Sequence, residues 1–171
     1  MMRHDLIAPL FSAPFALAPL NLALSRLMRR IAARHPGILR RLGPHGQVRI
    51  LIDVPDAPVL LLMQPSGQRL TAHRRTAPPP GSDATIRGRL GAFLAMLHGT
   101  EDGDALFFSG ELEISGDTAA VLALRNALDD AELDLTEELA TLGGRAGPAL
   151  RRLSGIVARR SGLVLSRPEI F

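Results

Sequence analysis

Residues 104–128 read DALFFSGELEISGDTAAVLALRNAL. After an apolar turn, the alternating segment 111–115 is typical of a short strand. Gly116 then permits a tight turn, and Asp117 is a typical N-cap for a helix over 118–130. One face of that helix collects apolar residues, namely Val121, Leu124 and Leu128. The stretch therefore predicts a strand that leads directly into an amphipathic helix.

The preceding sequence predicts further strands and helices. In order, these are a helix over 20–34, a further turn over 38–42, strands over 47–54, 59–63, 68–74 and 84–90, and a short helix over 91–98. The segment 59–63 is continuously apolar, as expected for a strand that is covered on both sides. Capping signals at Asp134 and at Gly147-Pro148 predict two more helices. The element order predicts an α+β domain with a mostly antiparallel sheet.

Charge divides the chain into three parts. Residues 1–75 carry 11 Arg and three acids, residues 76–144 carry three Arg and 13 acids, and residues 145–171 carry six Arg and one acid. One interpretation is that these segments form solvated faces whose charges partly neutralise one another in the fold. The alternative is that the two basic ends bind an anionic surface and that the acidic middle binds a basic partner. We expect an N-terminal apolar arm and amphipathic helix over 1–35, a domain over 36–144, and a basic C-terminal helix and tail over 145–171.

An uncharged apolar segment over 6–25 overlaps the start of the first helix. Its length suits a signal peptide or a membrane span, but three prolines oppose one continuous helix, and the basic cluster follows the segment instead of preceding it. We interpret its first part as a hydrophobic arm that docks on the domain, on a dimer partner or on a bilayer. The candidate membrane-surface residues are Phe11, Phe15, Arg26, Arg29, Arg30 and Arg34.

The composition excludes several kinds of chemistry. The chain has no Cys, and so no disulfide, thiol nucleophile or thiolate metal site. It has no Lys, and so no Schiff base or P-loop. The G-x-S-x-G and G-x-G-x-x-G motifs are absent, and the five His lack metal-ligand spacing, which favours structural or surface roles for them. We therefore expect no catalytic residues, no metal and no cofactor.

Nucleic-acid binding is the alternative that the basic segments raise. Proteins that read single strands stack bases on aromatic side chains, whereas this chain has six Phe and neither Tyr nor Trp. The Arg residues also lie on helices with wide apolar faces, which is typical of helices at a lipid interface. The sequence therefore favours a protein that does not bind nucleic acid.

The stretch quoted above resembles the sterol carrier protein type 2 domain. That family has a G-x-L-x-I-x-G strand before the helix that closes a lipid cavity, and the matching residues here are Gly110, Leu112, Ile114 and Gly116. The segments 104–108, 116–118 and 126–133 further resemble the bacterial UbiT family of accessory factors for oxygen-independent ubiquinone biosynthesis. One departure is Glu111, where the broader family often has Lys, and it weakens any transfer of sterol specificity.

The resemblance implies a five-stranded, mostly antiparallel sheet covered by helices, with an apolar lipid cavity between the sheet and the helices at 91–98 and 118–130. The candidate lipid-binding residues are Phe93, Leu97, Phe107, Phe108, Leu112, Val121, Leu124 and Leu128. For each of them, ordinary core packing is the alternative.

The UbiT resemblance also implies a function and partners. We expect a cytoplasmic, non-catalytic protein, peripheral on the inner membrane, that holds isoprenoid-quinone intermediates or phospholipid for the hydroxylases UbiU and UbiV. The alternatives are another sterol-carrier-type module that binds or transfers lipids or acyl chains, and an accessory factor of aerobic ubiquinone synthesis.

Overall fold

The structure is a computed structural model that describes residues 17–55, 57–98 and 109–131, without the side chains of Leu94, Met96, Leu97 and His98. The apolar arm up to residue 16 and the two helices predicted after residue 131 lie outside this part of the chain.

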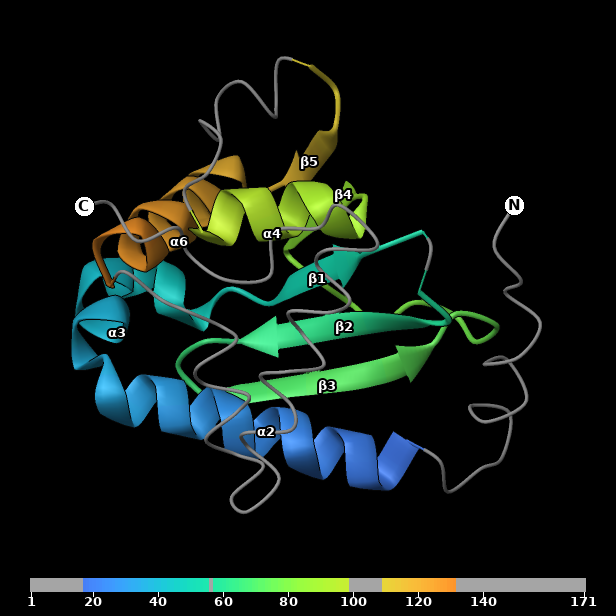
Figure 1. Ribbon diagram of the computed structural model, residues 1–171, viewed down its shortest axis with the longest axis horizontal. Coiled ribbons are helices and arrows are strands. Elements are labelled where there is room, and N and C mark those ends of the chain that lie inside the picture. Colours follow the sequence, from blue (N-terminus) through green and yellow to red (C-terminus); the bar gives the residue numbers. More distant parts are fainter. Residues whose placement is uncertain (1–16, 56, 99–108, 132–171) are drawn as a thin grey trace, which may run out of the picture.

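A five-stranded sheet forms the centre of the fold (Figure 1). Its strands are β1 (Ile50–Asp53), β2 (Val59–Gln64), β3 (Arg69–Arg74), β4 (Ala84–Gly88) and β5 (Leu112–Gly116). Their order across the sheet is β3-β2-β1-β4-β5, and every pair is antiparallel except β1 with β4, which is parallel. The predicted α+β class with a mostly antiparallel sheet is confirmed.

The helices are α2 (Leu17–Arg34), α3 (Pro36–Leu42), the 3-10 helix η2 (Gly43–Gln47), α4 (Leu90–His98) and α6 (Thr118–Ala131). α2 begins three residues before the predicted start at Leu20. Pro19 lies in its first turn, where an amide has no partner within the helix, so a proline costs little there. The fourth strand ends at Gly88, not at Leu90, because Leu90 already begins α4.

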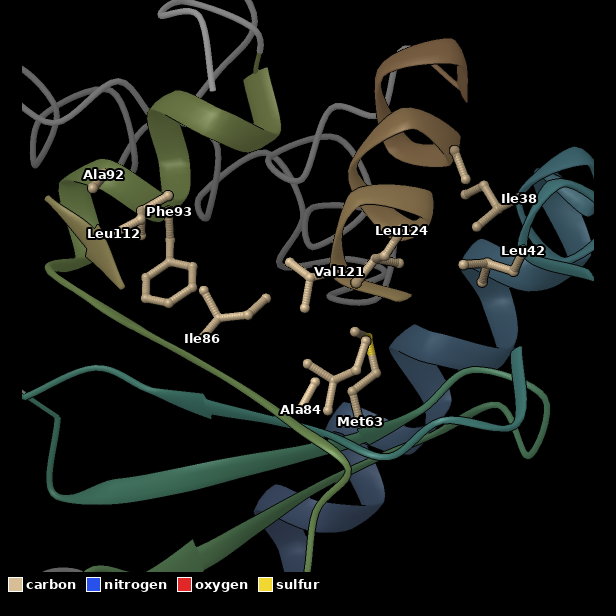
Figure 2. Packing of buried hydrophobic residues seen from close by; sticks show 12 residues of the cluster. Ile38, Leu42, Met63, Ala84, Ile86, Ala92, Phe93, Leu112, Val121 and Leu124 are labelled. Carbon is tan, nitrogen blue, oxygen red and sulfur yellow. The ribbon is translucent and has the colours of Figure 1, made fainter. Parts of the chain in front are cut away.

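The strand register separates two faces of the sheet. Ile50 pairs with Met63 on one side and with Ala84 on the other, so these three side chains share the face that α3, α4 and α6 cover (Figures 1 and 2). Leu51 pairs with Leu62, and both are buried on the opposite face together with Leu60. The predicted strand over 59–63 therefore has buried side chains on both faces, as its continuous apolar sequence indicates.

The connection from β3 to β4, residues 75–83, is held by an Arg–Asp pair at each end. The Arg75 guanidinium lies 2.7 Å from Asp53 of β1, and it also donates to the Val54 carbonyl at 2.8 Å. At the other end, the Arg49 backbone N–H donates to the Asp83 carboxylate at 2.8 Å, and its guanidinium lies 3.2 Å away. Hydrogen bonds from Arg49 lower the pKa of Asp83 below its ordinary value. This crossover is what makes β4 parallel to β1.

α2 lies along the outer edge of β3 (Figure 1). The Asn21 side chain accepts a hydrogen bond from the Ala72 backbone N–H at 2.6 Å and donates to the Ala72 carbonyl at 3.4 Å. One turn later, the Ser25 hydroxyl donates to the Leu70 carbonyl at 3.3 Å. These bonds satisfy backbone groups that an edge strand otherwise leaves unpaired. The division at residue 35 between an N-terminal unit and the domain stays a prediction.

Candidate lipid-binding site

The largest apolar cluster of the described residues lies between the sheet and the helices (Figure 2). Its buried members are Ile38, Leu42, Ile50, Met63, Ala84, Ile86, Ala92, Phe93, Leu112, Val121, Leu124 and Ala127. We call this set the central cluster. It draws on α3, α4 and α6 above the sheet and on four strands, β1, β2, β4 and β5, below them.

Four of the eight candidate lipid-binding residues belong to the central cluster, namely Phe93, Leu112, Val121 and Leu124. Leu128 is half-buried and packs against it. Figure 2 shows Phe93 beside Ile86, with Val121 and Leu124 directed from α6 toward the strands. The Leu97 side chain, Phe107 and Phe108 lie outside the described residues. The structure thus brings together the predicted residues that it describes, while their role in holding a lipid stays a prediction.

The junction between β5 and α6 sets the position of this helix over the sheet. Gly116 has φ +81°, and a Cβ there would lie 2.3 Å from the Asp83 carbonyl oxygen. The Asp117 backbone N–H donates to that oxygen at 2.9 Å. The Asp117 carboxylate accepts from the Ala120 N–H at 2.9 Å, which confirms Asp117 as the N-cap. Glycine is required at 116 because only it combines this φ with so close an approach.

The central cluster offers an apolar environment and no acid–base chemistry. Its buried members carry no ionisable side chain. Among the residues that the structure describes, no three His, Asp or Glu side chains gather in a way that would hold a metal ion. No helix in the same part of the chain is long and apolar enough to cross a membrane. The described residues of the central cluster therefore form an apolar environment.

Three of the four candidate membrane-surface residues of α2 lie on its outward face. Arg26, Arg29 and Arg34 are exposed and Arg30 is half-buried, while Phe11 and Phe15 precede the described residues. Leu22, one turn before Arg26, exposes 49% of its surface. The outward face of α2 is therefore apolar in its first half and cationic in its second half.

One hollow was not predicted from the sequence. It lies between α3 and the end of α6, has a volume of about 220 Å³, and is lined by His35, Gly37, Ile38, Arg41, Ala127, Asp130 and Ala131. Arg41 and Asp130 form an ion pair across the two helices. The sequence signal for such a hollow is weak, because the glycine and the two alanines leave space only where α3 packs on α6.

Residues 27–129 match the family model of the SCP-2 sterol transfer family. The chain belongs to this family. The match runs from α2 to near the end of α6, so it includes all five strands of the sheet. The SCP-2 resemblance that the strand–turn–helix stretch carries is thereby confirmed.

Solved structures with the same fold include the SCP2 domain of UbiJ, a ubiquinone synthesis protein. Its sequence is 24% identical to this SCP-2 chain, and the superposition has a TM-score of 0.50. The aligned region covers 73% of this chain and 97% of the UbiJ domain. Sterol carrier protein 2 from Yarrowia lipolytica, in its apo form, is 11% identical over 72% of this chain and 97% of its own, with a TM-score of 0.46. No curated protein matches the chain.

Proposed function

We propose that the protein is a lipid-binding accessory factor of ubiquinone biosynthesis that holds isoprenoid-quinone intermediates or phospholipid in the apolar region around the central cluster. The SCP-2 family membership is the observation that carries this proposal. The resemblance of residues 104–133 to the UbiT family and the fold shared with the UbiJ SCP2 domain support ubiquinone synthesis as the setting.

The physical reason for such a factor is the insolubility of a polyprenyl tail. Each buried CH₂ group contributes about 0.8 kcal/mol, so ten contacted carbons supply roughly 8 kcal/mol before ordering costs. A site lined like the central cluster, with Phe93, Leu112 and Val121, provides this burial without an unpaired charge. The tail would then enter a protein environment instead of aggregating in water.

The chemical conversion of the bound intermediate is carried out by other proteins in this proposal. The central cluster has no ionisable side chain with which to transfer a proton. We therefore propose UbiU and UbiV, the hydroxylases of the oxygen-independent route, as the enzymes that receive the bound intermediate. The resemblance to UbiT is what points to these partners and to this route.

The first prediction concerns the ligand itself. Native mass spectrometry of protein purified from a ubiquinone-producing bacterium should show bound species in the mass range of isoprenoid quinones or phospholipids. Organic extraction followed by chromatography should then identify them. Recovery of free fatty acids alone would favour the alternative of a general lipid carrier, and protein without any lipid would refute the proposed function.

The second part of the proposal is peripheral attachment to an anionic membrane through α2. Leu22 and its small neighbours would contact the acyl boundary, with Arg26, Arg29 and Arg34 at the level of the head groups. Each Arg near an anionic surface contributes about 1 kcal/mol, so three contribute roughly 3 kcal/mol. Such a location would place the apolar site next to the source of its ligand.

The second prediction tests this attachment by flotation with vesicles that contain phosphatidylglycerol. Replacing Arg26, Arg29 and Arg34 together by Gln should weaken binding about a hundredfold, in line with the roughly 3 kcal/mol of lost attraction. High salt should also weaken binding of the wild-type protein, because exposed charges are screened within about 10 Å at 0.1 M ionic strength.

A matched control removes the same charge elsewhere. Arg40, Arg69 and Arg89 are exposed and lie outside α2, so their joint replacement by Gln should leave flotation nearly unchanged. If the two triple variants lost vesicle binding equally, the binding would depend on total charge and not on α2. A wild-type protein that ignores anionic vesicles even at low salt would contradict it altogether.

A further inference from the structure

The hollow between α3 and α6 combines an apolar floor with a polar rim. Ile38 and Ala127, on its floor, are 7% and 1% exposed and belong to the central cluster. His35, Arg41 and Asp130 supply its polar groups, and the last two form an ion pair whose side chains are exposed. The hollow therefore adjoins the apolar region of the proposed lipid site at one side and reaches solvent at the other.

We propose that this hollow is the head-group subsite of the protein, and that it takes a single oxygen-substituted aromatic or quinone ring. The inference rests on the proposed function, since the ring would be the head of the isoprenoid ligand. The tail attached to it would continue past Ile38 and Ala127 toward the central cluster.

The size of the hollow suits a single ring. An apolar cavity of roughly 150 Å³ holds one benzene molecule, whereas sites for larger ligands begin at about 300 Å³. The hollow, at about 220 Å³, lies between these values. It has room for one ring with a few small substituents, and less room than the sites of larger ligands have.

The polar rim suits oxygen substituents. The Arg41 guanidinium has five N–H donors, of which its ion pair with Asp130 uses only some. Carbonyl or methoxy oxygens of a ring accept from such donors, and the Asp130 carboxylate accepts from a phenolic hydroxyl. Because Arg41 and Asp130 neutralise each other, the rim favours a neutral polar ring over a strongly anionic group.

The test uses a ring without a tail. The probe is 2,3-dimethoxy-5-methyl-1,4-benzoquinone, titrated into isotope-labelled full-length protein while backbone amide shifts are recorded. The chain has no Cys or Lys side chain, the side chains that react most readily with a quinone, and return of the amide shifts after dialysis shows that the binding is reversible. The amides of Gly37, Ile38 and Ala131 should shift together, in a saturable manner.

Two variants fill the hollow from opposite sides. A Cβ at Gly37 would meet only the end of the flexible Arg40 side chain, at 4.0 Å, so the Cβ of Gly37→Leu has room. Ala131→Leu adds a similar volume from α6. Each should weaken binding of the ring at least tenfold. The control Ala33→Leu, on the exposed surface of α2, should bind the ring like the wild-type protein.

The outcomes separate this inference from the proposed function. If the ring shifts no amide around the hollow, or if both filled variants bind it normally, the subsite is refuted even where isoprenoid lipid still co-purifies. If the ring binds in the hollow and both filled variants lose it, the subsite is supported. In that case, purified protein without any bound lipid would refute the proposed function alone.

Discussion

Replacing Leu124 by Asp should abolish lipid co-purification and strongly destabilise the protein. Leu124 is 6% exposed and lies in the central cluster, where no charged partner is available among the buried members. Transfer of an unpaired carboxylate into such a site costs several kcal/mol, which is a large part of the roughly 5–15 kcal/mol that stabilises a typical domain. Urea unfolding monitored by circular dichroism measures the loss of stability. Lipid extraction from the same preparation measures the loss of bound lipid.

The same helix provides the matched control. Leu122 is 50% exposed, two residues before Leu124, so Leu122→Asp introduces the same charge at the surface and should retain fold and lipid. The volume-conserving change Leu124→Met should cost less than about 1.5 kcal/mol and should also retain lipid. A Leu124→Asp protein that folds like the wild type and still carries lipid would contradict the assignment of the lipid to this region.

The second large effect is expected at Gly116, where even alanine should lower the free energy of unfolding by at least about 2 kcal/mol. The backbone has φ +81°, and the added Cβ would lie 2.3 Å from the Asp83 carbonyl oxygen, a backbone atom that has little freedom to move. Relief of this clash would break the hydrogen bond from the Asp117 N–H to Asp83 and tilt α6 away from the sheet. Denaturant titration gives the size of the effect.

Gly81 is the control for this substitution. It lies close to Asp83 in sequence, its φ is not in the left-handed range, and its Cβ would meet only the Arg49 guanidinium, at 3.5 Å. Gly81→Ala should therefore change stability by less than about 1 kcal/mol. If Gly116→Ala unfolds at the same denaturant concentration as Gly81→Ala, the β5–α6 junction does not depend on the left-handed glycine.

Local sequence patterns predicted most of the individual elements. The alternation around Leu112, the glycine at 116 and the cap at Asp117 are properties of neighbouring residues, and the structure confirms β5 and α6 there. The continuous apolar run at 59–63 likewise predicted a strand that is buried on both faces. The alternation, the left-handed turn and the cap are each visible within a few residues, although the contact of Gly116 with Asp83 joins distant segments.

Features that depend on distant segments were not predictable in this way. The parallel pairing of β1 with β4 follows from the crossover at 75–83, and no local pattern encodes strand order. Asn21 and Ser25 are polar residues in the mostly apolar first half of α2, and their role is evident only once α2 lies beside β3. The ion pair of Arg41 with Asp130 joins residues about 90 positions apart, and the hollow beside it depends on the same contact.

The bonds from α2 to β3 have a consequence for how this domain is isolated. The family match begins at residue 27, after both Asn21 and Ser25. A fragment trimmed to that boundary would present the bare Leu70 and Ala72 backbone as a template for strand pairing between molecules. We expect such a fragment to associate into fibrous or amorphous material, and a domain that keeps α2 from its start at Leu17 to avoid this.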